Sequence, residues 1–92
     1  MCRKDEEGRR WTKDAVTAEV IVIVRELSPG FDGSVTARTT FAKLGWDTWY
    51  RLRLLKPVWK RLREQLPAQL VVDRVKSVGD LRDLVWALME DA

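Results

Sequence analysis

The stretch Phe41–Trp49, FAKLGWDTW, decides how the rest of the chain is interpreted, because it joins a loop to the longest amphipathic run of the sequence. Gly45 can adopt a positive φ that other residues avoid, and Asp47 is a favourable N-cap for the helix that follows. Thr48 would lie in the first helical turn, with its hydroxyl in solvent beside the positive end of the helix dipole. A phosphate ester is well placed there, and with no base nearby in sequence the hydroxyl suits modification by another enzyme.

The same residues resemble the attachment site of the acyl carrier protein family, in particular its polyketide-synthase type. The family pattern is Phe, two variable residues, Leu-Gly, an aromatic residue and then Asp-Ser-Leu. The matching positions here are Phe41, Leu44, Gly45, Trp46, Asp47, Thr48 and Trp49. The resemblance continues without a gap from Val35 to the C-terminus, so it covers well over half of the chain.

The resemblance implies an all-α fold, an acyl-carrier-protein-like four-helix bundle. Such a bundle has three main helices, one short helix, and a long loop between the first and second helices. In the family, a transferase attaches a 4′-phosphopantetheine arm to a serine hydroxyl, and the arm carries acyl groups as thioesters. Thr48 stands at the position of that serine, and Trp49 replaces the leucine that follows it.

The threonine changes what can be expected of this position. Its extra methyl group stiffens χ1 in a helix and crowds the attacking oxygen, and misplacing a nucleophile by about 1 Å can cost on the order of a hundredfold in rate. We therefore predict that Thr48 carries no arm and that the chain needs no cofactor. One alternative is a functional acyl carrier protein with 4′-phosphopantetheine on Thr48, and another is a plain helix start at Asp47 and Thr48.

Hydrophobic periodicity predicts the helices on either side. A first helix is expected within residues 11–27, although Val20–Val24 is β-branched throughout and would by propensity suit a buried strand. A final helix is expected from Val78 to about Met89, and Ser77 followed by Asp80 indicates a capping box at its start. The segment before it is expected to hold a short helical turn and the core residues Leu70, Val71, Val72 and Val75.

The second helix is expected from about Thr48 to Leu66, after a loop over residues 28–46. The loop is expected to be anchored by Phe31, Val35, Phe41 and Leu44. Pro57 removes one backbone hydrogen bond inside this helix at a cost of roughly 3 kcal/mol, which predicts a bend or break near residues 54–56. The apolar face, which makes Trp59 a core residue, consists of Leu52, Leu55, Val58, Trp59, Leu62 and Leu66.

The opposite face of the second helix predicts a binding surface. It carries an indole followed by a stripe of cations, namely Trp49, Arg53, Lys56, Lys60 and Arg63. The resemblance implies an acidic second helix that meets basic partners, and because like charges repel across an interface, those partners should bind badly here. An exposed tryptophan is typical of a contact hot spot, and Trp46 beside the Asp-Thr pair is a further candidate. A merely solvated helix face is the alternative.

These observations lead to a predicted function. We interpret the chain as a module of polyketide or related assembly-line biosynthesis that acts through protein–protein contacts of its second helix. The expected partner is an assembly-line enzyme or domain with an acidic surface, and the module is expected to be a monomer. A basic helical module that binds nucleic acid through the same cations is a less favoured alternative, because a net charge of +3 is small.

Composition narrows the remaining classes. The 92 residues suit one domain, with a flexible charged leader over residues 1–10 and the helical domain over residues 11–92. The chain has no histidine and one cysteine, Cys2, which excludes Cys-His and Ser-His nucleophile pairs and zinc sites built from these residues. We therefore expect no enzymatic activity and no metal site. No apolar run approaches a membrane span or a secretory signal, so a cytoplasmic location is expected.

Overall fold

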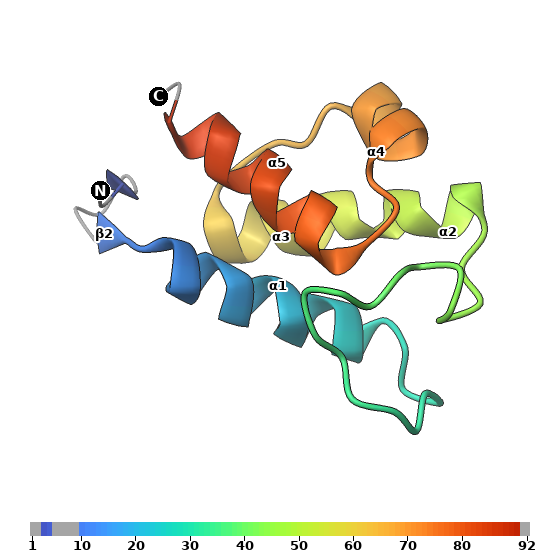
Figure 1. The fold of residues 1–92 in the computed structure, drawn as a ribbon. Helices are drawn as coiled ribbons and strands as arrows, with labels where there is room; N and C mark the ends of the chain where they lie inside the picture. The colour runs from blue at the N-terminus through green and yellow to red at the C-terminus, as the bar shows by residue number, and fades with distance from the viewer. Residues whose placement is uncertain (1–2, 5–9, 91–92) are drawn as a thin grey trace.

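The structure is a computed structural model that describes residues 3–4 and 10–90. Helices form most of this part of the chain (Figure 1). In chain order the elements are β1 (Arg3–Lys4), β2 (Arg10–Trp11), α1 (Lys13–Glu26), α2 (Thr48–Arg51), η1 (Leu52–Leu54), α3 (Leu55–Leu62), α4 (Ala68–Arg74) and α5 (Val78–Glu90). The prediction of a mostly helical fold is confirmed. β1 and β2 pair antiparallel, with Arg3 opposite Trp11, and the rest of the predicted leader lies outside the described residues.

α1 forms although its sequence is rich in β-branched residues. Its N-cap is Thr12, whose hydroxyl accepts a hydrogen bond from the Ala15 N–H at 3.1 Å. The apolar spacing decides the outcome, because it places on one side of the helix the buried residues Val16, Val20, Ile23 and Val24. Packing of this face outweighs the small β preference of valine and isoleucine. The prediction of a helix within residues 11–27 is therefore confirmed.

α1 packs against both α5 and α3 (Figure 1), and these three helices contribute most of the buried apolar residues. α5 begins with a variant of the predicted capping box: the Ser77 hydroxyl accepts a hydrogen bond from the Asp80 N–H at 3.1 Å, and the Asp80 carboxylate accepts one from the Lys76 N–H at 3.1 Å. The buried apolar residues contributed by α5 are Val78, Leu81, Val85 and Met89.

The predicted second helix is a single helical run made of α2, η1 and α3. Within it, η1 is a 3₁₀ turn in which the Leu55 N–H donates to the Leu52 carbonyl three residues earlier. Pro57 follows in the first turn of α3 and has no N–H for the carbonyl of Arg53, so the normal helical ladder is interrupted at this place. A change of helix type at η1 therefore replaces the predicted bend near residues 54–56.

The run ends at Leu62, before the predicted end at Leu66. Arg63 adopts a left-handed conformation with φ 57°, and its N–H donates to the Trp59 carbonyl at 3.0 Å. A left-handed residue at this position ends a helix. Leu66 is nevertheless buried, from the segment that leads to α4.

The 3₁₀ turn also rotates the residues before it relative to those after it. Each 3₁₀ residue rotates the chain about 20° more than an α-helical residue, so the three residues of η1 add roughly 60°. The fully buried residues of the run are Leu54, Val58 and Leu62. Leu52 and Leu55 are half-buried. Trp59 is 45% exposed, so the prediction that it packs in the core is wrong.

α4 corresponds to the short helical turn predicted between the second and final helices. Val71 within it and Val75 just after it are buried, as predicted. Val72 is half-buried. Leu70 is 37% exposed, so the prediction that it belongs to the core is wrong. The short helix therefore contributes only one side to the core.

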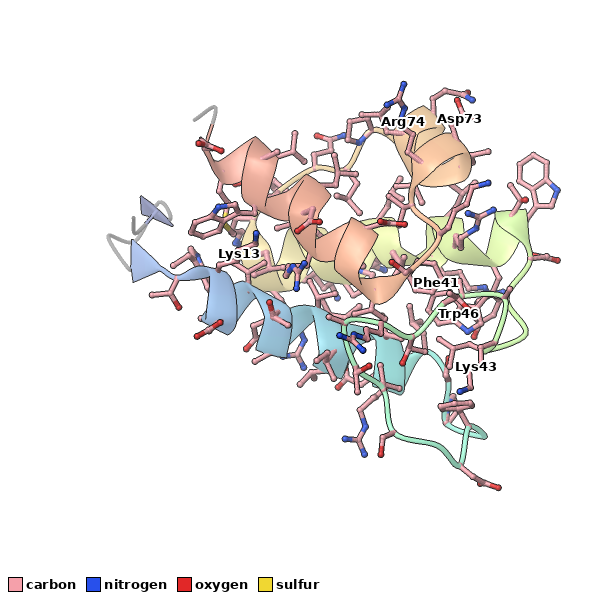
Figure 2. All side chains as sticks on the ribbon, viewed as in Figure 1. Lys13, Phe41, Lys43, Trp46, Asp73 and Arg74 are labelled. Atoms are coloured by element: carbon pink, nitrogen blue, oxygen red, sulfur yellow. The ribbon has the colours of Figure 1, made fainter. Side chains whose placement is uncertain are left out.

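The long loop between α1 and α2 is anchored unevenly. Phe41 is buried, whereas Lys43 in the same loop is exposed (Figure 2). Val35 and Leu44 are partly buried against the core, and Phe31 is half-buried outside the core cluster. Three of the four predicted anchors thus contact the core.

The loop is also bound to the start of α5 through its backbone. Thr40 and Ser77 form an isolated antiparallel bridge, and the Phe41 N–H donates to the Lys76 carbonyl at 3.0 Å. These bonds hold the loop in place between residues that are far apart in the sequence. Among the described residues, no helix combines the length and the apolar composition needed to cross a membrane.

Replacing Gly79 by alanine is expected to lower the free energy of unfolding by about 1–3 kcal/mol. A Cβ at Gly79 would lie 2.8 Å from the Ala37 carbonyl oxygen, which the Gly79 N–H already binds at 2.8 Å. Helix propensity alone would favour alanine by about 1 kcal/mol, so the sign of the change in urea unfolding separates the two effects. Gly30→Ala is the control, since nothing lies within 4 Å of a Cβ there. A more stable Gly79→Ala protein would contradict this packing.

Candidate functional site

Asp47 and Thr48 begin the helical run, as the sequence indicates. The Asp47 carboxylate caps α2 by accepting a hydrogen bond from the Tyr50 N–H at 2.7 Å. Gly45, two residues earlier, adopts φ 79°, a value that glycine reaches without strain. These short-range features make Thr48 the first residue of α2.

The Thr48 hydroxyl is not free in solvent, contrary to expectation. Thr48 is half-buried, and its Oγ1 accepts a hydrogen bond from the Arg51 guanidinium at 3.1 Å. The same guanidinium donates to the Val75 carbonyl at 2.7 Å, so Arg51 is tied to the segment after α4. Since an arginine stays protonated, it cannot take a proton from the threonine. The contact holds the hydroxyl without activating it.

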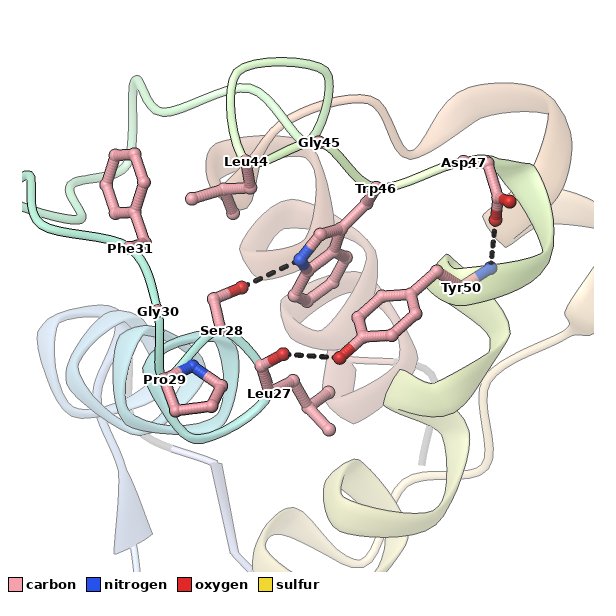
Figure 3. Close-up of a pocket in the computed structure, with 10 residues that line it drawn as sticks. All are labelled: Leu27, Ser28, Pro29, Gly30, Phe31, Leu44, Gly45, Trp46, Asp47 and Tyr50. Atoms are coloured by element: carbon pink, nitrogen blue, oxygen red, sulfur yellow. Dashed lines mark hydrogen bonds between the residues drawn. The ribbon is translucent and has the colours of Figure 1, made fainter.

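Trp46, a predicted contact residue, is buried with only 9% of its surface exposed, so little of its side chain is available to a partner. Its ring stacks on Phe41 with centroids 4.9 Å apart and planes 4° apart, and it meets the edge of the Tyr50 ring. The indole N–H donates to the Ser28 hydroxyl at 2.7 Å (Figure 3). Trp46 therefore joins the start of the helical run to the end of α1.

An open cleft of about 400 Å³ surrounds these contacts (Figure 3). Its wall includes the rings of Pro29, Phe31 and Tyr50 and the Asp47 carboxylate. The donors on this wall are largely used already: the Tyr50 hydroxyl donates to the Leu27 carbonyl at 2.5 Å, and most of the backbone N–H groups donate to oxygens of the chain itself. The cleft is therefore poorly suited to a phosphate or carboxylate, which needs donors.

The five residues that the sequence singled out lie along the helical run and just past its end. Their side chains are all exposed, and we call them the basic surface: Trp49, Arg53, Lys56, Lys60 and Arg63. Trp49 is 75% exposed. The Arg53 guanidinium lies 5.0 Å from the centre of the Tyr50 ring. Arg63 lies beyond the end of α3 rather than on it.

The cations of the basic surface differ from the other two arginines of the run. In the described part of the chain, none of these four cations forms an ion pair. Arg61, in contrast, pairs with Glu19 at 3.0 Å and with Glu26 at 3.3 Å, and thereby joins α3 to α1. Arg51 is held by Thr48 and Val75. Arg51 and Arg61 thus make contacts within the fold, whereas the four cations of the basic surface are exposed and form no ion pair among the described residues.

A hollow beside Trp59 is a feature that the sequence interpretation missed. It measures about 340 Å³ and is lined by Leu55, Lys56, Trp59 and Gln65. The Arg63 guanidinium lies 5.8 Å from the centre of the Trp59 ring. The signal that could have located it is the spacing of Leu54, Val58 and Leu62, because residues four apart share one side of a helix and Trp59 lies at the edge of that side.

Glu64 should make stability depend on pH. Burial raises the pKa of its carboxyl group above the usual 4.5, so its charged form is disfavoured in the folded protein and stability is lost as the pH rises through that raised pKa. We expect Glu64→Gln to be more stable than the wild type at pH 7, by less than about 0.5 kcal/mol because the half-buried group keeps much of its solvent. Thermal unfolding at pH 7 and pH 3 tests this. An advantage that persists at pH 3 would contradict it.

The candidate site thus has two parts: the Thr48 hydroxyl, which accepts a hydrogen bond from Arg51, and the basic surface along the helical run that Thr48 begins. Among the described residues, no group of three or more His, Cys, Asp or Glu side chains could hold a metal ion. Comparison with protein-family models, with curated proteins and with solved structures gave no match for this chain.

Proposed function

We propose that this chain is an acyl-carrier-protein-like module of a polyketide or related assembly line, and that it binds an acidic surface on an enzyme or domain of that assembly line. The order of the elements supports the carrier-like part: a long helix, a loop, a helical run that begins at Asp47-Thr48, a short helix and a final helix. The resemblance over Phe41–Trp49 supplies the rest of the support.

The observation that carries the docking role is the unpaired state of the basic surface. Long cationic side chains on a protein often have carboxylates nearby, and Arg61 of the same run has two. Leaving four cations unpaired beside an indole that is 75% exposed gives an acidic partner both a charge to meet and an apolar ring to cover. Steering by such a surface would speed association with an acidic partner.

The residues at the attachment position fit a 4′-phosphopantetheine arm poorly. The Thr48 oxygen is half-buried, bears a crowding methyl group, and already accepts a hydrogen bond from Arg51. The adjoining cleft is short of free donors for a phosphate. The proposal is therefore that Thr48 keeps an inherited position without being modified, while a true carrier with the arm on Thr48 remains the alternative outcome.

The modification state gives a direct test. After incubation with coenzyme A and a permissive phosphopantetheinyl transferase, the intact mass of the wild type is expected to stay unchanged. Thr48→Ser removes the crowding methyl group, and we expect it to gain the mass of the arm at a rate at least on the order of a hundredfold higher. Thr48→Ala is the blank. A mass gain in the wild type that disappears in Thr48→Ala would make the protein a functional carrier.

Nucleic-acid binding is the second candidate, because exposed indoles beside cations also suit unpaired bases. It makes a different prediction. Binding to duplex DNA should weaken steeply with salt, with a logarithmic slope near −0.9 for each phosphate contact. Absent or salt-independent binding would remove this candidate and leave the docking role.

A further inference from the structure

The hollow beside Trp59 extends the basic surface beyond what the sequence indicated. Trp59 is 45% exposed although tryptophan is a large apolar residue, and half-buried Leu55 forms another part of the wall. The volume of about 340 Å³ is large enough for a leucine or phenylalanine side chain, and the hollow is open to the outside of α3. Leu55 and Trp59 form the apolar part of its wall, and Lys56 and Gln65 form the rest.

Lys56 lines the hollow, and two further cations lie next to Trp59, one in the sequence and one in space. Lys56 forms part of its wall, Lys60 is the residue after Trp59 in α3, and the Arg63 guanidinium lies over the Trp59 ring at 5.8 Å. Arg63 reaches this place because its left-handed conformation turns the chain at the end of α3. None of the three is paired with a carboxylate in the described part of the chain. An apolar depression bordered by cations favours an apolar side chain bordered by carboxylates.

We propose that the hollow receives one leucine- or phenylalanine-sized side chain from an acidic amphipathic helix of the partner protein. On a helix, residues three and four positions from the anchor lie on the same face. Glutamates or aspartates at those positions would therefore meet Lys56, Lys60 and Arg63 while the anchor enters the hollow. Helix-in-groove recognition commonly uses anchors with this spacing. The inference rests on the proposed docking role and adds the class of partner to it.

Two other occupants fit less well. A second copy of this chain would bring the same cations against each other, and each copy carries a net charge of +3. A single-stranded nucleic acid needs an open ring face on which a base can stack, and Arg63 already lies over the Trp59 ring. An acidic helix meets both the charge and the apolar depression.

The test uses two synthetic helical peptides that differ at one position. Each has glutamates three and four residues on either side of a central residue, which is leucine in one peptide and alanine in the other. Affinity for the full chain is measured by fluorescence anisotropy at low ionic strength. We expect the leucine peptide to bind about fivefold to tenfold more tightly, because part of the anchor leaves water on binding.

Two tryptophan variants locate the anchor. In Trp59→Ala the preference for the leucine peptide over the alanine peptide should disappear. Trp49→Ala should lower the affinity for both peptides and keep that preference. Both side chains lie outside the core, so both variants should fold, which circular dichroism verifies. A preference that survives in Trp59→Ala would overturn the inference.

The remaining outcomes separate the inference from the proposed function. If both peptides bind equally and lose affinity when Arg53 and Lys60 are reversed in charge, the docking role stands and the anchor is overturned. If neither peptide binds the wild type, the docking role fails and the inference fails with it. If an oligothymidylate binds more tightly than the leucine peptide at the same salt concentration, the surface serves nucleic acid and the inference is overturned.

Discussion

Trp46→Ala should lower the free energy of unfolding by about 3–5 kcal/mol, the range for removing a buried aromatic side chain. Trp46 stacks on Phe41 and touches the edge of Tyr50, so its removal leaves a cavity between two other rings. It also takes away the donor to the Ser28 hydroxyl. Because this residue joins the loop, the end of α1 and the start of the helical run, no neighbouring element can easily move in to fill the space.

Urea unfolding followed by circular dichroism measures the change. Trp49→Ala is the matched control, because it removes the same side chain from a position that is 75% exposed; it should alter the free energy of unfolding by no more than about 0.5 kcal/mol. Trp46→Phe keeps a ring and loses the hydrogen bond, so an intermediate loss is expected. Similar losses for Trp46→Ala and Trp49→Ala would show that the two tryptophans are not divided between core and surface as described.

Reversing two charges on the basic surface should have the largest effect on binding. We expect Arg53→Glu combined with Lys60→Glu to lower the affinity for the leucine peptide described above by about a hundredfold or more, because attraction is replaced by repulsion at two positions. Neither side chain is buried or ion-paired in the described part of the chain. The double variant should therefore fold as well as the wild type.

The control changes the net charge equally at another place. Arg38 and Lys43 are exposed on the loop before the helical run. Reversing both charges should lower the affinity for the same peptide by less than about tenfold, through long-range electrostatics alone. Affinities at low and moderate salt are compared for both double variants. Equal losses in the two variants would mean that only the net charge matters and that no docking surface exists on the helical run.

Pro57 shows where interpretation of the sequence stopped. The proline was recognised as a disturbance, but an apolar face drawn with one constant helical period placed Trp59 in the core. The structure contains a 3₁₀ turn over Leu52–Leu54, and the buried side of the run consists of Leu54, Val58 and Leu62, four residues apart, which leaves Trp59 exposed. A local change of helix type is difficult to infer from a sequence because it depends on what the neighbouring helices can accept.

The environments of Trp46 and Trp59 depend on tertiary contacts. The sequence makes Trp46 a candidate contact residue because it stands beside Asp47 and Thr48. Its burial depends on Phe41 and on Ser28, which lies 18 residues away in the chain. Thr48 is a similar case, since its hydroxyl is held by an arginine that is itself fixed by Val75 beyond α4.

Several features follow from the order of the residues alone, namely the helical character of the chain, the extent of α1 and α5, the caps at Asp47 and Ser77, and the positive φ of Gly45. These features depend on interactions within one turn or on a repeated apolar face, and both are written in neighbouring residues. Three other features emerge only in the folded molecule: which tryptophans are buried, where the helical run ends, and which cations of the basic surface form no ion pair among the described residues. Those properties depend on contacts between residues far apart in the chain, whose distances the order of the residues does not specify.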